Sequence, residues 1–429
     1  MPSPDSFRIL IVIVPVVLFV IGISKPLYAV IGYMILVYCK TSSYYPQFAA
    51  IQAELVFALL ILARIFLTGN FFTRLSLNYN RVNMYLYLFI LSIFISYMFA
   101  WDKQYSWDNA VYHFIKAFIF YIMIVTSITS WEDLKIFTWS FVVMFAYLAY
   151  EPFYNIFMGI DSSQAYFGSY YISDVGLLSG HVALANNMNQ MIPIAFYLMY
   201  SVRKPLYKIL ASIPLILFTA SLIGSGSRGG VVGFAVVAVC IVYFSKHRMF
   251  LGVVTALLCI VLFLSTSLSY TASRIDAGST MSRLTGLTHG IGILERGHIL
   301  GVGPGCFLFA RGRYFGWTME AHNIYGELIG DLGIPGILAW LFLMYHTFLN
   351  LFAVKKKLKA LFLEEDFLYY LVMGIQVSLI VRLVISMASH GLYYFYWYLM
   401  AGLSIILIKI VDSMSASEEK GKTTTPGFT

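Results

Sequence analysis

Residues 301–336 read GVGPGCFLFARGRYFGWTMEAHNIYGELIGDLGIPG, and they interrupt a chain that is otherwise dominated by long apolar runs. Three glycines surround Pro304, a composition that ends helices and lets the backbone approach a ligand closely. His322 then lies between a polar segment and an apolar run that resumes at Ile324. A histidine at such a boundary stands where a membrane helix meets water and lipid headgroups. The pattern therefore indicates a functional site with His322 as its chemical centre.

The composition is that of an all-α polytopic membrane protein. Of the 429 residues, 60% are hydrophobic and 11% are charged, whereas soluble domains carry about 25% charged residues. The formal net charge of +8 is typical of cytoplasmic loops and contact with lipid headgroups. Because basic residues do not alternate with aromatic ones along a stripe, nucleic acid is excluded as a partner and membrane lipid is expected.

Hydropathy predicts about 12 transmembrane helices, or 13 if the first two short runs span separately, since a spanning helix needs about 20 apolar residues. We expect a single transmembrane domain over residues 1–411, with a retained first helix, and a cytoplasmic, disordered tail at 412–429. The candidate spans lie near residues 8–23, 26–40, 48–67, 82–100, 111–129, 134–158, 181–202, 207–225, 229–245, 249–269, 328–353, 367–387 and 391–411.

Lysine and arginine in short loops set the predicted orientation. Four basic clusters, including Lys355–Lys359, fall on one side when the spans alternate, and that side is assigned to the cytoplasm. The same alternation places residues 159–180, 225–229 and 270–327 outside. Residues 270–327 then form one large periplasmic loop, long enough for several helices lying over the membrane. Long loops of this kind commonly act as lids or binding elements, so we expect this loop to carry the site.

Two arginines at the outer face could receive an anion. Arg228 lies in the sequence SGSRGG, where a helix begins with its N–H groups available, and arginine beside a helix N-terminus is a good receptor for pyrophosphate. Arg283 shares the 270–327 loop with several other arginines, among them Arg311 and Arg313, which defies the positive-inside tendency and indicates an anion there. The alternative is that these arginines are interfacial anchors or contact headgroups.

His322 can take up a proton near neutral pH and so could act as a general base toward a hydroxyl, with Glu320 and Asn323 in support. The alternative is an interfacial histidine bonded to a carbonyl. Asn186 and Asn187 lie in an apolar run, where amides either line a cavity, as in sugar recognition, or bond across helices.

Metals and cofactors are not expected. No pair of histidines has the spacing of HExxH, no D-x-D pair occurs, and the four cysteines form no CxxC. A nucleotide-binding loop is also absent, because GVGPG at 301–305 lacks the strand and helix of a dinucleotide fold.

Taken in order, these motifs resemble the bacterial O-antigen ligase and polymerase superfamily. The pieces that carry the resemblance are SRGG at 227–230, SRLTGL at 282–287, GVGPGCF at 301–307 and the run from AHN to LGIPG at 321–336. The earlier part is similar to the O-glycosylation ligase branch associated with exosortase loci, through its split first span, WDNAVYHFIK at 107–116 and ANN at 185–187.

The resemblance implies a metal-independent, inverting glycosyltransferase of the membrane-embedded type in the bacterial inner membrane, with its active site facing the periplasm. Its donor would be an undecaprenyl-pyrophosphate-linked glycan, and its acceptor a hydroxyl of the lipid A core, of a growing polymer or of a protein Ser or Thr. His322 falls on the family's proposed base and Arg228 on the arginine that binds the donor pyrophosphate. Arg283 falls on a second loop arginine, although Leu287 replaces the aromatic residue usual nearby.

Charge development in glycosyl transfer agrees with this assignment. The departing pyrophosphate gains negative charge, and fixed arginines aimed at it lower the barrier in place of a divalent metal. A ligase and a polymerase would use the same donor, so both remain open. A lipid-linked-glycan transporter or flippase would instead need charged or broken helices near the bilayer midplane, and a structural scaffold would not need clustered outer arginines.

Overall fold

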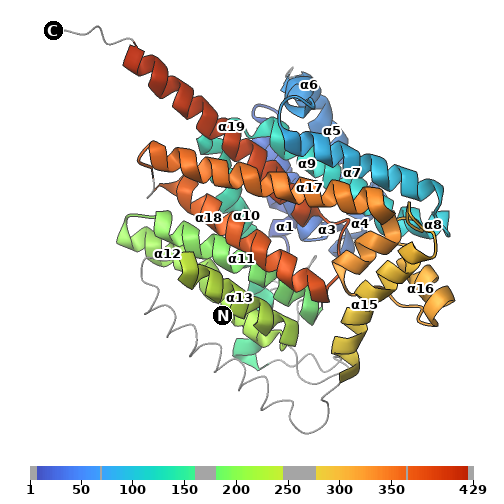
Figure 1. Ribbon diagram of the computed structural model, residues 1–429. Helices are drawn as coiled ribbons and strands as arrows, with labels where there is room; N and C mark the ends of the chain where they lie inside the picture. The colour runs from blue at the N-terminus through green and yellow to red at the C-terminus, as the bar shows by residue number, and fades with distance from the viewer. Residues whose placement is uncertain (1–6, 68–69, 160–179, 245–276, 364–365, 424–429) are drawn as a thin grey trace. The chain divides into compact units, whose positions relative to one another are not determined.

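The computed structural model describes residues 7–67, 70–159, 180–244, 277–363 and 366–423, and over these ranges the chain forms helices and no strand (Figure 1). The predicted all-α fold is therefore confirmed. The chain divides into two compact units, each built from three segments. Unit 1 comprises Met1–Thr68, Ser130–Arg274 and Glu364–Ile385, and unit 2 comprises Gly69–Thr129, Ile275–Leu363 and Ser386–Thr429.

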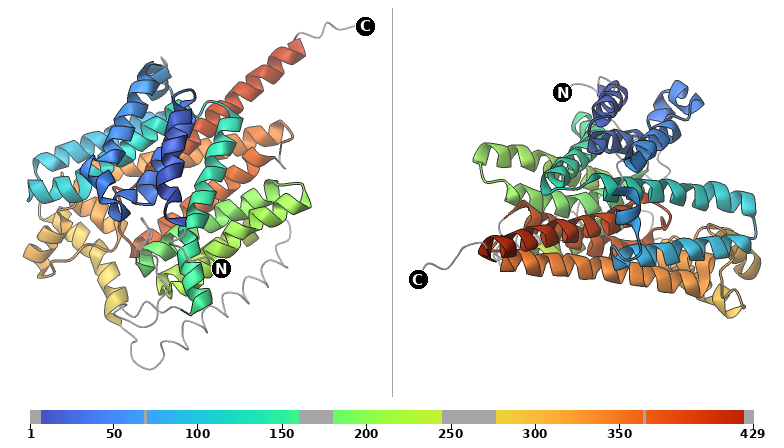
Figure 2. Two further views of the ribbon diagram at one scale, coloured as in Figure 1. Left: turned by 180° about the vertical axis from the view of Figure 1, so that it is seen from behind. Right: turned by 90° about the horizontal axis from the view of Figure 1, so that it is seen from above.

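In unit 1, α11 is central and packs against α12, α13 and α18, while α1 pairs with α2 (Figure 2, left). Its helices are α1 (Leu10–Gly22), α2 (Pro26–Tyr38), α3 (Thr41–Tyr44), α4 (Pro46–Ala50), α5 (Ala53–Leu67), α10 (Trp131–Met158), α11 (His181–Ser201), α12 (Pro205–Gly224), α13 (Arg228–Phe244) and α18 (Phe367–Ile385).

In unit 2, the long helix α17 lies beside α7, α15 and α19 (Figures 1 and 2). The helices of this unit are α6 (Asn70–Leu75), α7 (Arg81–Met98), α8 (Lys103–Ser106), η2 (Trp107–Val111), α9 (Tyr112–Ser127), α15 (Ala277–Glu295), α16 (Phe307–Phe315), α17 (Ile324–Ala360), η4 (Ser386–Ala388) and α19 (Phe395–Thr423).

Seven helices among the described residues are long and apolar enough to cross a membrane, and three shorter ones are apolar. The chain is thus a polytopic membrane protein, while the predicted count of 12 or 13 spans stays a prediction; the run at 249–269 lies outside the described residues. The seven segments are Arg81–Met98, Lys103–Ser127, Trp131–Met158, Pro205–Gly224, Ile324–Ala360, Phe367–Ala388 and Phe395–Ser417.

Two boundaries differ from those predicted. Helix α17 begins at Ile324, so the end of the 270–327 loop is already helical, and α15 and α16 lie within that loop. Helix α19 continues past residue 411 to Thr423, into the segment predicted to be a disordered tail. Alanine, glutamate and lysine in this segment favour helix despite their polarity, and Asp412 forms an ion pair with Lys357 of α17. Residues 424–429 lie outside the described part.

A kink in α17 receives the glycine-rich segment. Gly333 leaves the helical conformation at φ 62° and ψ −157°, and the N–H of Ile334 donates to the carbonyl of Ile299 at 2.9 Å. A Cβ on Gly333 would lie 2.0 Å from that carbonyl oxygen, and a Cβ on Gly301 would lie 2.0 Å from the carbonyl oxygen of Asp331. The glycines were predicted to let the backbone approach a ligand, and this stays a prediction. Gly301 lets the backbone of this segment approach the backbone of α17.

Asp331 of α17 holds the glycine-rich segment in place through hydrogen bonds. Its fully buried carboxylate accepts hydrogen bonds from the backbone N–H groups of Gly305 at 2.7 Å and Phe307 at 2.8 Å. It also accepts one from the hydroxyl of Tyr393 at 2.9 Å. The segments GVGPGCF (301–307) and DLGIPG (331–336) therefore pack against each other, and we call this contact the clamp. The clamp restricts the path of residues 316–323, which lie between the two segments and include His322.

Candidate functional site

His322 is held in a strained backbone conformation immediately before α17. Its φ is +46°, in the left-handed region that costs a residue with a side chain roughly 1–2 kcal/mol. The next residue, Asn323, is buried and caps α17, accepting from the N–H groups of Tyr325 at 3.0 Å and Gly326 at 3.2 Å. Its amide also donates to the carbonyl of Met387 at 3.1 Å. Asn323 thus positions His322 from the helix end.

A second histidine, which the sequence argument did not place in the site, lies against the first. Nδ1 of His390 is 3.3 Å from Nδ1 of His322, although the two residues are 68 positions apart. The same His390 nitrogen is 3.3 Å from a carboxylate oxygen of Glu320. Glu320 and His390 are exposed and His322 is half-buried. Because one neutral imidazole must donate and the other accept, the contact couples the tautomers of the two rings.

Arg311 was predicted to support anion binding, but its guanidinium points into the protein. The side chain is fully buried and donates to the carbonyl of Glu320 at 2.8 Å, to Nδ1 of His289 at 3.0 Å and to the hydroxyl of Thr285 at 3.2 Å. Its guanidinium carbon is 5.1 Å from the ring centroid of Trp317. These contacts join α15, α16 and the segment before His322, so Arg311 stabilises the loop that carries the site.

His289 is the neutral partner in this arrangement. Its ring stacks on Phe315 with centroids 3.9 Å apart. Burial, followed by the charges of Arg311 and Arg296, lowers the pKa of His289 below its usual 6.5. A neutral ring can accept the Arg311 hydrogen bond at Nδ1, which a protonated ring could not do.

Helix α15 brings the backbone of Arg283 toward His322. A Cβ on Gly286 would lie 2.1 Å from the carbonyl oxygen of Ala321, and a Cβ on Gly326 would lie 2.3 Å from the carbonyl oxygen of Gly286. Arg283 precedes Gly286 by about one helical turn, and its side chain lies outside the described part of the structure. Arg313 is exposed on α16, with its guanidinium carbon 5.4 Å from the ring centroid of Trp101.

Arg228 is the first residue of α13, and its side chain also lies outside the description. Gly230 serves helix packing, because its Cβ would lie 2.8 Å from Cβ of Ala185 on α11. The neighbouring amide of Asn189 donates to the carbonyl of Gly230 at 2.9 Å. The SRGG sequence at the start of α13 therefore packs against α11 near Ala185 and Asn189.

For Asn186 and Asn187, the two amides predicted to belong to the site, no side-chain hydrogen bond to α13 like that of Asn189 is found in the described part of the structure. Asn187 donates to the carbonyl of Ala183 in its own helix at 2.8 Å, and Asn186 is buried. Arg228, Asn186 and Asn187 belong to unit 1. The other predicted site residues belong to unit 2, namely Arg283, Arg311, Arg313, Glu320, His322 and Asn323.

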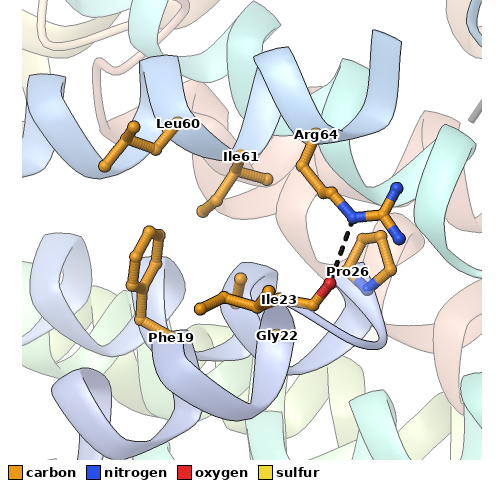
Figure 3. A pocket seen from close by; sticks show the side chains of 8 residues that line it. Phe19, Gly22, Ile23, Pro26, Leu60, Ile61 and Arg64 are labelled. Carbon is orange, nitrogen blue, oxygen red and sulfur yellow. Dashed lines mark hydrogen bonds between the residues drawn. The ribbon is translucent and has the colours of Figure 1, made fainter. Parts of the chain in front are cut away.

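Unit 1 also contains an apolar pocket of about 260 Å³ between α1, α2 and α5 (Figure 3). Arg64 lies at its edge and donates from Nε to the carbonyl of Ile23 at 3.1 Å. None of the predicted site residues lines it, and its walls offer mainly hydrocarbon surface. The lining residues are Phe19, Gly22, Ile23, Pro26, Ala29, Leu60, Ile61 and Arg64.

Residues 213–341 match the family model described as O-Antigen ligase. This part of the chain is therefore similar to O-antigen ligases, as the sequence motifs predicted. The O-antigen ligase match begins within α12 and ends within α17, so it includes Arg228, Arg283 and His322 but not His390. A search of curated proteins found no match. Similarity to the branch associated with exosortase loci stays a prediction.

Proposed function

We propose that this protein transfers a glycan from an undecaprenyl-pyrophosphate-linked donor to an acceptor hydroxyl, by a metal-independent and inverting reaction. The O-antigen ligase match supports a ligase-like or polymerase role. The observation that carries the finer proposal is the placement of His322, which Asn323 fixes at the start of α17 and which α15, the helix of Arg283, approaches at Ala321.

In the proposed reaction, the acceptor oxygen attacks the anomeric carbon and a new glycosidic bond forms. The bond from that carbon to the pyrophosphate oxygen breaks, and the electron pair leaves with the undecaprenyl pyrophosphate. His322 takes the acceptor proton as general base. Because Nδ1 of His322 faces His390, we assign Nε2 to the acceptor proton.

Arg228 and Arg283 are assigned to the pyrophosphate, whose negative charge grows as the bond breaks. Preorganised positive charge is the largest single contribution in many reactions of this type. The lipid tail of the donor would stay in the bilayer. We place the protein in the bacterial inner membrane with the site facing the periplasm, on the strength of the basic residues assigned to the cytoplasmic side.

The acceptor distinguishes the two candidate activities. A ligase would use a hydroxyl of the lipid A core or of a protein Ser or Thr, and a polymerase would use the growing glycan on a second lipid carrier. The family match supports both.

Reconstitution tests the proposal. Purified protein in liposomes, lipid-linked glycan donor and one acceptor at a time are incubated with excess chelator, and the product is separated by gel or mass spectrometry. Transfer to one acceptor class in the presence of chelator is expected. Donor consumption only when a divalent ion is added back would contradict the metal-independent mechanism.

A further inference from the structure

We propose that Glu320, His322 and His390 form a binding site for one divalent transition-metal ion, with Zn²⁺ the preferred ion. We further propose that the bound ion inhibits transfer, and this second part rests on the proposed role of His322 as base. The three side chains come from the loop before α17 and the segment before α19, and their ligand atoms all lie within 4.8 Å of one another.

The distances between these atoms fit a tetrahedral ion. Zinc binds imidazole nitrogen and carboxylate oxygen at about 2.0–2.2 Å, which places any two ligand atoms of a tetrahedron about 3.3–3.6 Å apart. Nδ1 of His322 and Nδ1 of His390 are 3.3 Å apart, and Nδ1 of His390 and the Glu320 oxygen are also 3.3 Å apart. Two of the three distances between ligand atoms therefore match a tetrahedral ion. The third, between Glu320 and His322, can be adjusted by a rotamer change of the exposed glutamate.

The two segments that carry the ligands are tied together on either side of the histidines. Asn323, next to His322, donates to the carbonyl of Met387 at 3.1 Å. Gly391, next to His390, donates from its N–H to the carboxylate of Glu327 on α17 at 3.3 Å. These bonds hold the two histidines close together before an ion arrives, so little chain entropy would be lost on binding.

The ligand types predict which ions bind. Two imidazole nitrogens and one carboxylate oxygen form a set that zinc accepts, with a fourth position left for water. Mg²⁺ and Ca²⁺ prefer all-oxygen sites, so they should compete poorly.

An ion at this site would interfere with His322 directly. It would occupy the Nδ1 lone pair, which leaves the proton of the neutral ring on Nε2, so that Nε2 could no longer take the acceptor proton. With its water, the ion would also fill space beside His322 on the side of Glu320 and His390. Transfer should therefore fall as the site fills and recover when a chelator removes the ion.

Binding is measured without any substrate. Full-length protein purified in detergent without a polyhistidine tag is stripped with chelator and then titrated with Zn²⁺ by equilibrium dialysis. Co²⁺ titration provides a second signal, because a tetrahedral cobalt site gives an intense visible absorption band. The variants are His390→Ala and Glu320→Gln, and His298→Gln is the matched control, since His298 bonds to Tyr314 rather than to a member of the cluster.

We expect one tightly bound Zn²⁺ per chain in the wild type and in His298→Gln. Loss of one second-shell partner already weakens metal binding by about 10–100-fold, so His390→Ala should weaken it by about 100-fold or more and abolish the cobalt band. Glu320→Gln should weaken it too, which keeps the test informative if His390→Ala is poorly folded. Equal Zn²⁺ affinity in the wild type and both variants would overturn the site.

The inhibition is tested in the reconstituted transfer assay. Zn²⁺ should inhibit wild-type transfer at the concentration that half-fills the site, and chelator should reverse the effect. Binding without inhibition in a protein that transfers glycan would overturn the inhibitory role. Binding in a protein that transfers no glycan under any condition would leave the metal site standing and refute the proposed function instead.

Discussion

Replacing Asn323 tests the idea that the cap of α17 positions His322. Asn323→Ala removes two hydrogen bonds from the N–H groups of Tyr325 and Gly326 and leaves the carbonyl of Met387 without its amide donor. Loss of a helix cap costs about 0.5–2 kcal/mol, and loss of the hydrogen bond to the exposed residue Met387 costs about 0.5–1.5 kcal/mol, because water can replace the amide. The sum predicts a loss of about 1–3.5 kcal/mol of stability.

Asn323→Asp separates the two contributions. The aspartate can still accept from both N–H groups, and its charge is favourable at a helix N-terminus, but it cannot donate to Met387. Asn323→Asp should therefore keep most of the stability while it loosens the contact between the loops of His322 and His390.

Both variants are compared with the wild type by thermal unfolding in detergent, followed by a dye that reacts with the buried thiols Cys39 and Cys306, and by transfer rate. Asn323→Ala should unfold at a lower temperature and transfer slowly, and Asn323→Asp should unfold near the wild-type temperature with reduced transfer. Wild-type stability and transfer in Asn323→Ala would refute the reasoning.

Three further predictions concern the two donor-binding arginines, Gly301 and His289. Arg228→Ala and Arg283→Ala should each weaken donor use by about 1.5–3 kcal/mol, with only partial recovery in the lysine variants because a point charge does not reproduce a planar fork; normal kinetics at limiting donor would contradict this. Gly301→Ala should destabilise the protein far more than Gly297→Ala, because both glycines have positive φ but only the first would place its Cβ against a carbonyl, that of Asp331; equal melting temperatures would argue against the clamp. Because burial and the nearby arginines depress the pKa of folded His289, the unfolded chain binds more protons just below pH 6.5, so stability should fall as the pH drops from 6.5 toward the folded pKa. Burial and the charge of Arg313 lower the pKa of His298 as well, so His289→Gln should reduce this slope without removing it, and a slope unchanged by that substitution would assign it to other groups.

The sequence was sufficient to predict the class of the protein and its resemblance to the O-antigen ligase family. Apolar composition decides that the chain lies in a membrane, and the spacing of SRGG, GVGPGCF and AHN to LGIPG carried the resemblance that the match to residues 213–341 confirmed. Helix boundaries were less accessible, because Ala, Glu and Lys after residue 411 are polar enough to resemble a tail and yet favour helix.

The site was harder to predict because its contacts join distant segments. Arg311 lies in a loop rich in arginines, and only the fold shows that its guanidinium is buried among Glu320, His289 and Thr285. His390 is 68 residues from His322, so a search for ligands spaced along one helix could not find the pair. The only sequence signal for it was a histidine at the edge of another apolar run.

The central claim is that His322 takes the proton of the acceptor, and a pH–rate profile with saturating donor tests it most directly. The account predicts that His322→Ala binds donor normally but loses about 10²–10⁴-fold in turnover, the usual contribution of a general base. Wild-type transfer should fall toward acidic pH as the imidazole gains a proton, and His322→Gln should be slow without that acid limb. A folded His322→Ala protein that binds donor and transfers glycan at the wild-type rate would contradict the account.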